Sequence, residues 1–446
     1  MQLRRWLQFS LRTLLLAVLL FGSATSLWWH WDPWVVRLEL PIEDVQRVSF
    51  SKNGELLLIS SGDDFSSTKQ HRVELWNVHR RKRALQKSFP RYASPFRARF
   101  SQTEKWLVIP HFNRYSSCLI DSTTGEYFQF KSDDRPAHID CLFDNDLKAL
   151  IQIKDGNHNI VNIPDGKVLG NITFNLGPKL SPVFYISPDG KCILTPGLET
   201  RAYDSDTAEL MFRFSSDQVY WHVQFSEDST MFWTQLERTI SVYSTATGRK
   251  ITTFENIANG GFSPDGKLFV TNHSSNEAAG IARIWRLDTL ELIATLQQVP
   301  AGCWLWFTND GQRIGGYGDK SLHMWQLNRP EPLVHIPDYV AADDDFLRAI
   351  SLGHDSDSEA LWLWDTRTGK RIARLRAARL ERIDRILFSP TNEHIVIHNY
   401  DNVVVWERRR PESIFGVFFL PGFWLTITFA PAFFWSLFRD RCARHQ

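Results

Sequence analysis

The chain lacks the motifs on which recognisable catalytic and metal-binding sites depend. Its five cysteines, at positions 118, 141, 192, 303 and 442, are an odd number and include no C-x-x-C pair. This excludes a zinc framework and a disulfide-stapled mini-domain. No H-E-x-x-H, G-x-S-x-G, P-loop or G-x-G-x-x-G occurs in a context that would make it work. We therefore expect no enzyme activity, no cofactor and no resident metal.

A surplus of one charge sign is also missing, because the net charge is only +1. Basic residues are concentrated near the two ends, where residues 1–34 carry +2 and residues 408–446 carry +4, which leaves −5 for the middle. Nucleic-acid binding needs a surface that neutralises phosphates. A mildly acidic middle part argues against a nucleic-acid partner.

Charged residues are absent from two apolar segments. Thr13 to Trp31 holds 19 residues without Asp, Glu, Lys or Arg, which is about enough to cross a bilayer core. We interpret it as an uncleaved anchor, with a cleaved signal peptide as the rival because small residues follow the apolar run. Ser413 to Phe438 holds 26 uncharged residues interrupted by Pro421 and Pro431. A kinked transmembrane span is the leading interpretation, followed by a re-entrant or interfacial hairpin and then a buried soluble element.

The distribution of arginines predicts an orientation. Arg4, Arg5 and Arg12 precede the first apolar segment, whereas Arg37 is the one basic residue between it and Leu40. This bias places the N-terminus in the cytoplasm and the following domain outside. We expect an integral protein of the bacterial inner membrane, with its main domain on the extracytoplasmic side and both termini in contact with lipid.

What the sequence does contain is a repeat. Residues 260–288 read as a strand ending at Phe262, the turn Ser263-Pro264-Asp265-Gly266, a strand over 268–272 and a strand over 281–285. A fourth strand follows over 292–296. Four strands alone have two bare edges and little core, so the unit predicts copies of itself.

Nine copies align at a spacing of 39 to 44 residues. The residues that close the third strands are Trp76, Ile120, Val161, Tyr203, Tyr243, Trp285, Trp325, Trp364 and Trp406. The residues that open the first turns are Phe50, Phe100, Phe143, Ile186, Phe225, Phe262, Phe307, Val340 and Phe388. We expect eight or nine four-stranded units. If one of the nine aligned copies is an alignment artefact, it is the copy around Val340.

With Trp364-Asp365 closing one third strand, this pattern resembles the WD40 family of β-propellers. The D-x-x-T-G runs at Asp121 to Gly125 and Asp365 to Gly369 also resemble quinoprotein-type propellers. The resemblance implies an all-β, WD40-like β-propeller. The expected organisation is a cytoplasmic stub and transmembrane segment over 1–34, the propeller over 35–407, and a transmembrane segment with a basic tail over 408–446.

The last repeat ends without room for its fourth strand, and residues 35–40 alternate apolar and charged side chains without a repeat of their own. We predict that Val35 to Leu40 pairs beside Val403 to Trp406 and closes the ring. Both apolar segments then leave the propeller on the face that carries the first-to-second and third-to-fourth strand turns. We call this the turn face and its opposite the loop face.

Recognition is expected on the loop face, in the second-to-third strand loops over 60–72, 273–280 and 353–359. The candidate partner-binding residues there are Asp63, Asp64, His354, Asp355 and Asp357. The alternating carboxylates after His354 could contact a hard cation, but no EF-hand glycine accompanies them, so we expect a solvated loop.

The function expected from the resemblance is a membrane-tethered scaffold that binds protein partners through one propeller face. One alternative is an extracytoplasmic propeller enzyme or cofactor binder of the quinoprotein type. Another is a structural subunit of a membrane complex. The sequence identifies no small-molecule ligand.

Overall fold

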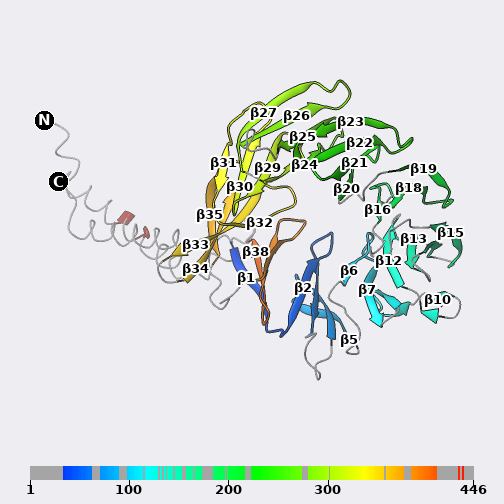
Figure 1. Ribbon diagram of the computed structural model, residues 1–446. Helices are drawn as coiled ribbons and strands as arrows, with labels where there is room; N and C mark the ends of the chain where they lie inside the picture. The colour runs from blue at the N-terminus through cyan, green and yellow to red at the C-terminus, as the bar shows by residue number, and fades with distance from the viewer. Residues whose placement is uncertain are drawn as a thin grey trace. The chain divides into compact units, whose positions relative to one another are not determined.

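The protein is an all-β propeller of nine four-stranded blades, as a computed structural model shows (Figure 1). The structure describes residues 34–62, 71–89, 98–113, 116–128, 131–132, 135–136, 138–143, 146–152, 157–163, 166–172, 184–195, 197, 199–215, 222–273, 280–300, 302–355, 358–375, 383–408, 430–431 and 434–435. Within this part of the chain, every blade has its strands hydrogen-bonded in antiparallel order, and the fold is WD40-like.

Blades 1 to 8 each take four strands in chain order, with a small hairpin between blades 2 and 3. Blades 1 and 2 are β2 (Val45–Phe50), β3 (Leu56–Ser61), β4 (His71–Asn77), β5 (Lys82–Phe89), and β6 (Arg99–Phe100), β7 (Trp106–Asn113), β8 (Ser116–Asp121), β9 (Tyr127–Phe128). The hairpin is β10 (Lys131–Ser132) and β11 (Arg135–Pro136). Blades 3 and 4 are β12 (His138–Phe143), β13 (Lys148–Gln152), β14 (His158–Asn162), β15 (Val168–Ile172), and β16 (Tyr185–Ile186), β17 (Cys192–Thr195), β18 (Glu199–Asp204), β19 (Leu210–Ser215).

The remaining blades follow the same order, except that the last one borrows a strand. Blades 5 and 6 are β20 (His222–Phe225), β21 (Met231–Leu236), β22 (Thr239–Ser244), β23 (Lys250–Glu255), and β24 (Ile257–Phe262), β25 (Leu268–His273), β26 (Gly280–Arg286), β27 (Leu292–Val299). Blades 7 and 8 are β28 (Trp304–Phe307), β29 (Arg313–Gly318), β30 (Ser321–Gln326), β31 (Val334–Ile336), and β32 (Tyr339–Ala342), β33 (Arg348–Asp355), β34 (Ser358–Asp365), β35 (Lys370–Leu375). Blade 9 is β36 (Arg385–Phe388), β37 (His394–His398), β38 (Val403–Arg408) and β1 (Trp34–Leu40).

The ring closes as the alternation in residues 35–40 predicts. β1 lies next to β38 in the sheet order β1-β38-β37-β36, so the first strand of the chain completes the last blade. Leu40 of β1 is buried in one core cluster with Val403 and Val405 of β38 and with Val45 of blade 1. Figure 1 shows this meeting of the dark-blue and orange strands. Closure leaves each first strand covered by its neighbours.

The turn between the first and second strands is held by a serine hydroxyl. This hydroxyl accepts from a backbone N–H across the turn and donates to an aspartate within it. In blade 6 the N–H of Leu268 donates to Ser263 Oγ (2.8 Å), and Ser263 Oγ donates to Asp265 Oδ1 (2.6 Å). Gly266 sits at φ +69, the left-handed region that glycine occupies at low cost. The same arrangement recurs at Ser51 and Ser187, so the predicted turns are confirmed.

The prediction for the eighth repeat was wrong by two residues. Its first strand ends at Ala342, and Val340 lies inside that strand. The turn differs because Asp343 takes the place of the serine and accepts from the N–H groups of Leu347 (2.7 Å) and Arg348 (3.0 Å). Asp343 is buried, and these hydrogen bonds replace the water that its carboxylate loses. The blade itself is nonetheless complete.

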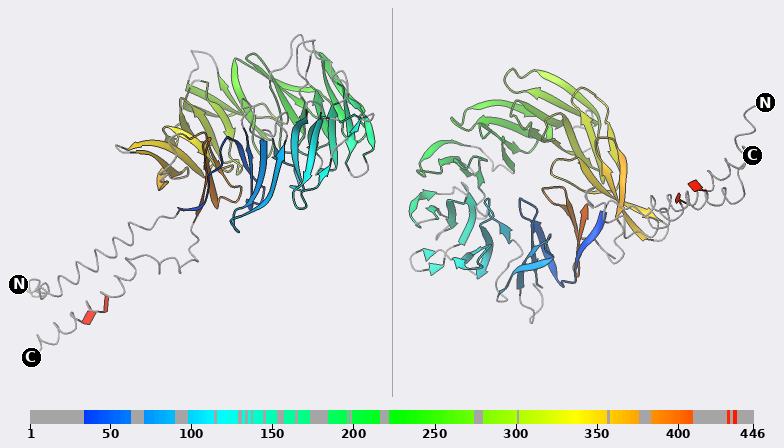
Figure 2. Two further views of the ribbon diagram at one scale, coloured as in Figure 1. Left: turned by 90° about the horizontal axis from the view of Figure 1, so that it is seen from below. Right: turned by 180° about the vertical axis from the view of Figure 1, so that it is seen from behind.

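The core lies between blades rather than within them. Each apolar cluster combines the faces of two neighbours, as in blades 1 and 2, where Leu75 and Phe89 pack with Leu107 and Ile120. Figure 2 shows edge-on how neighbouring blades stack side by side. Burying apolar area across each wedge stabilises the ring by about 25 cal/mol per Å² removed from water.

Polar contacts also join blades at the turn face. Asp146 of blade 3 accepts from Ser101 Oγ (2.5 Å), from the N–H of Gln102 (2.9 Å) and from both the N–H and the hydroxyl of Thr103 in blade 2. Because Asp146 is buried, these bonds replace the water that the carboxylate loses. They fix the angle between the two blades.

The two apolar segments predicted as transmembrane spans lie outside the described residues, apart from residues 430–431 and 434–435. Among the residues that the structure describes, no helix combines the length and the apolar character that a membrane crossing requires.

Candidate functional site

Two of the predicted partner-binding residues, His354 and Asp355, lie at the loop face. They end β33 and pair with Glu359 and Ser358 of β34. The predicted loop over 353–359 is therefore an extended hairpin with a two-residue connection, because the strands are longer than their apolar pattern indicated. Asp63, Asp64 and Asp357 fall outside the described residues.

Aromatic side chains are exposed at the loop face instead. Trp304, the first residue of β28, is 58% exposed, and it pairs in register with Tyr317 of β29, which is 39% exposed. Directly opposed residues on antiparallel strands present their side chains on the same side of the sheet. Blade 7 thus offers two neighbouring rings to solvent.

Rings from blades 5 and 8 extend this pair. His222, the first residue of β20, lies 6.3 Å from Trp304 by ring centroids and 4.9 Å from the buried ring of Trp233. Tyr339, the first residue of β32, lies 5.2 Å from Tyr317. We call Trp304, Tyr317, His222 and Tyr339 the loop-face aromatic cluster. Its members come from three blades, because first strands begin at the loop face.

The cluster is electrically neutral near pH 7. Burial lowers the pKa of His222 from its ordinary value near 6.5. Burial and the neighbouring Tyr317 raise the pKa of Tyr339 to about 12. The cluster therefore presents ring faces and a phenol donor but no formal charge, which suits apolar, aromatic or cationic side chains.

Two buried asparagines of blade 6 hold the backbone next to Trp304. Asn259 Nδ2 and Asn272 Nδ2 both donate to the carbonyl of Cys303, at 2.5 and 2.6 Å. Asn259 Oδ1 also accepts from the N–H of Leu305 (3.3 Å). With the peptides on both sides anchored, the backbone at Trp304 needs little further ordering on binding a partner.

The sequence analysis did not find this cluster, although the sequence contains a signal for it. Trp304, His222 and Tyr339 stand three residues before the end of their first strands. The equivalent positions in the other six repeats hold Arg47, Arg97, Asp140, Val183, Asn259 and Arg385. Charged residues take this position in four of the six, which indicates exposure although Asn259 is buried, and a tryptophan there departs from the usual burial of that residue.

A solvent-open depression of about 650 Å³ lies beside blade 5 on the same face. It is lined by Glu237, Arg238 and Thr239 at the second-to-third strand turn and by Glu255 and Asn256 at the end of the blade. The lining is polar and mixed in charge, so it adds polar contacts at the edge of the loop face rather than an enclosed ligand pocket.

The described part of the chain contains a serine and a histidine in hydrogen-bond contact, Ser321 and His323, 2.9 Å apart. Ser321 Oγ donates its hydrogen to the carbonyl of Gly318 (2.9 Å), so the imidazole must donate to the serine oxygen. A histidine that acts as general base would have to accept the serine proton instead.

The buried cysteines are not activated as nucleophiles. Burial raises the pKa of Cys118, Cys192 and Cys303 to about 12, which keeps these thiols protonated.

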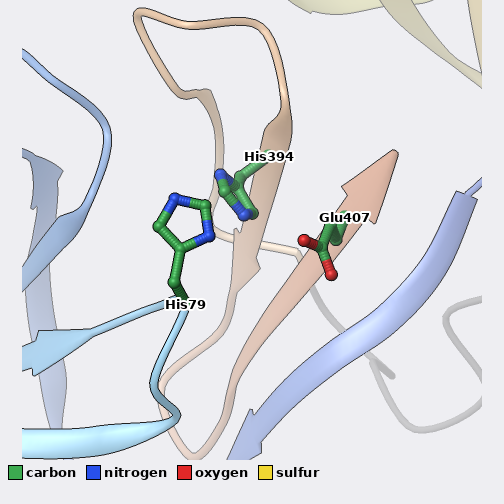
Figure 3. A group of neighbouring side chains, drawn as sticks. All are labelled: His79, His394 and Glu407. Atoms are coloured by element: carbon green, nitrogen blue, oxygen red, sulfur yellow. The ribbon is translucent and has the colours of Figure 1, made fainter. Parts of the chain in front are cut away.

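Two imidazoles and a carboxylate meet at the turn face (Figure 3). The ligand atoms of His79, His394 and Glu407 lie within 4.8 Å of one another, and the two imidazole centroids are 5.1 Å apart. This donor set suits zinc, but ligands of one tetrahedral ion with bonds near 2.0–2.1 Å stand only about 3.4 Å apart. Arg37 donates to the carbonyl of His79 (2.8 Å), and Arg80 follows it in the chain. The spread of the donors and the adjacent positive charge disfavour a cation, so we assign no metal site here.

Comparisons with known proteins identify the fold and nothing finer. No protein-family profile matches the sequence, and no curated protein matches it. Among solved structures 1659 chains match, so the fold is too widespread to select a function. One of them, described as the crystal structure of the eukaryotic initiation factor, is 12% identical with a TM-score of 0.55 over 75% of this chain and 88% of that chain. The chain is thus similar in fold to other propeller proteins.

Proposed function

We propose that this chain is a membrane-tethered β-propeller scaffold that binds a partner protein through its loop face and catalyses no reaction itself. The observation that carries the proposal is the exposure of Trp304 and Tyr317 side by side on that face. Exposed tryptophan and tyrosine on a rigid support are the residues that most often dominate protein interfaces. A closed ring of nine blades provides such a support.

The neighbouring chemistry fits a protein partner. The rings of His222 and Tyr339 extend the apolar area, and the polar depression beside Glu237 supplies hydrogen-bonding groups at the rim. An apolar centre with a polar edge is the usual anatomy of such interfaces. The tether rests on the uncharged segments 13–31 and 413–438 and on the arginines before the first one.

The recognition part is tested by chemical crosslinking of the tagged full-length chain in its native membranes, followed by quantitative mass spectrometry. We expect Trp304→Ala and Tyr317→Ala each to lower capture of the same partner by at least about tenfold, as for a hot-spot residue. Val36→Ala is the control, because Val36 is 46% exposed and belongs neither to the loop-face aromatic cluster nor to the residues of 37–405 that are exposed on the turn face. Equal capture by all variants with unchanged thermal unfolding would contradict loop-face recognition.

The tether is tested separately by extraction of membranes at alkaline pH and by proteolysis of sealed vesicles. We expect the chain to stay with the lipid after extraction and the propeller to be cleaved only from the extracytoplasmic side. Release of the chain into the supernatant would contradict the tether. Cleavage of the propeller only from the cytoplasmic side would show the opposite orientation.

A further inference from the structure

Large apolar side chains are unevenly distributed between the two faces of the propeller. Among the described residues of the unit 37–405, 16 such side chains are exposed, and 12 of them lie on the turn face. The 12 are Tyr127, Phe128, Leu147, Val168, Leu210, Met211, Ile251, Leu290, Leu292, Ile293, Leu333 and Ile372. The loop face has four, namely Trp304, Tyr317, Val340 and Tyr400. Exposed apolar side chains gathered on one face are groups that a binding partner or a lipid surface would cover.

Most of the 12 occupy one position of the repeat. They lie within three residues of the beginning of the outer strand, or immediately before it, in blades 2 to 8. All outer strands begin at the turn face because each follows a third-to-fourth strand turn. The side chains therefore stand around the edge of that face, and we call them the apolar rim.

The apolar rim is not needed for the core between blades. Leu210 is 46% exposed, Leu292 45% and Val168 52%, whereas Tyr203, which closes the third strand in the blade of Leu210, is buried. Outer strands have no neighbouring strand beyond them, so side chains at their beginnings stay partly exposed to solvent. Something outside the propeller must cover them if they are to leave water.

The places where the chain leaves the sheet indicate what covers the rim. β1 begins at Trp34 and β38 ends at Arg408, and both points belong to the turn face. The sequence beyond them contains the uncharged apolar segments of 19 and 26 residues. A face from which two lipid-soluble segments depart is the face that a lipid surface can reach.

The charges next to that departure point suit a lipid surface too. Blades 1 and 8 flank blade 9, and their third-to-fourth strand turns expose Arg80, Arg81 and Lys82 on one side and Arg367 and Lys370 on the other. The outer strands of blades 1, 5 and 8 begin with a lysine, whereas those of blades 3, 4 and 6 begin with Val168, Leu210 and Leu292. Lipid headgroups carry phosphate that pairs with lysine and arginine, while the boundary to the acyl chains accepts aliphatic and aromatic groups.

We propose that the apolar rim is a lipid-binding surface, on which the propeller rests flat against the bilayer with its loop face turned away from it. The inference deepens the proposed function and rests on its tether. Apolar contact carries the binding, and the basic turns beside blade 9 add a contribution that salt screens. Because the turn face contacts lipid, the loop-face aromatic cluster points away from the bilayer when it binds its partner.

The test uses the full-length chain in vesicles of phosphatidylcholine and phosphatidylglycerol that contain a phospholipid with a photoactivatable diazirine near its glycerol. After irradiation, the labelled peptides are mapped by mass spectrometry. We expect labels on peptides with Leu210 and Met211, and on those with Leu292 and Ile293, several-fold above peptides with Trp304 and Tyr317. Raised salt should reduce labelling of blades 1 and 8 more than that of blades 4 and 6.

Two matched variants show whether labelling depends on contact with lipid or only on exposure of the side chain to solvent. Ile293→Glu, at a position 41% exposed, should remove labelling of the blade 6 edge, whereas Val340→Glu, at 36% exposed on the loop face, should leave the map unchanged. Unchanged thermal unfolding confirms that both variants fold.

Three other outcomes overturn the inference, and they do so in different ways. Labels confined to residues 13–31 and 413–438 would leave the tether intact and disprove the lipid-bound rim. Labels on neither the ends nor the rim would disprove the tether and the rim together. An unlabelled rim that crosslinks to a second copy of the chain would make it a dimer interface instead.

Discussion

At the scale of single residues, buried polar groups in the turns decide how firmly the blades hold one another. Asp146 is the clearest case, because one buried carboxylate receives four hydrogen bonds from blade 2. Its removal would leave Ser101 and two backbone donors without their acceptor, in a place that water reaches poorly.

We therefore predict that Asp146→Ala lowers the free energy of unfolding by about 2 to 4 kcal/mol. The measurement is the urea midpoint of the purified full-length chain. Asp344→Ala, an exposed aspartate in the corresponding turn of blade 8, is the control and should change the midpoint little. Equal midpoints for both variants would show that the Asp146 bonds add no net stability.

A second residue-scale prediction concerns His398, which is 2% exposed at the end of β37. Burial lowers the pKa of its imidazole below its ordinary value. The unfolded chain then binds the proton more tightly than the folded one, so stability is complete above about pH 6.5 and decreases as the pH falls further. The thermal midpoint should decrease from pH 8 to pH 5, and less steeply in His398→Gln. Parallel curves for the two proteins would contradict a buried neutral His398.

At the scale of elements, much of the blade could be predicted from the sequence because it depends on local chemistry. Every one of the nine residues chosen as closing a third strand lies in one, from Trp76 in β4 to Trp406 in β38. The turn of blade 8 was misplaced because Asp343 takes the place of the serine or threonine that begins this turn in most other blades.

The loop-face aromatic cluster could not be predicted in the same way. It joins His222, Trp304 and Tyr339 from three blades, and their proximity depends on how blades rotate about the axis. With 18 tryptophans in the chain, burial is the sound expectation for each one. The cluster appears only when first strands are set side by side.

The closing strand gives the prediction at this scale. Leu40 is 5% exposed within the cluster that joins blades 9 and 1, so Leu40→Ala should destabilise the propeller by about 2 to 4 kcal/mol. Val36→Ala in the same strand, at a position 46% exposed, should cost less than about 0.5 kcal/mol. Thermal unfolding of both variants checks this. A Leu40→Ala protein as stable as the parent would mean that β1 is not a structural part of blade 9.

At the scale of the whole molecule, the account assigns different tasks to the two faces of one ring. The turn face has the apolar rim and the departure points of the chain, while the loop face has the aromatic cluster. The division follows from closure, because pairing of β1 with β38 brings Trp34 and Arg408 to one face. If the ring closed differently, neither the lipid-facing rim nor the outward-facing rings would follow.

Hydrogen–deuterium exchange of the full-length chain tests that closure most directly. β1 is the outer strand of blade 9, and its amides that are hydrogen-bonded to β38 open only when the blade opens. We therefore predict that these alternate amides over 34–40 exchange as slowly as those over 403–408. Both should be slower than the second-to-third strand connection at 399–402. Rapid exchange over 34–40 beside a protected β37 would show that the first strand does not complete blade 9, and would contradict the account.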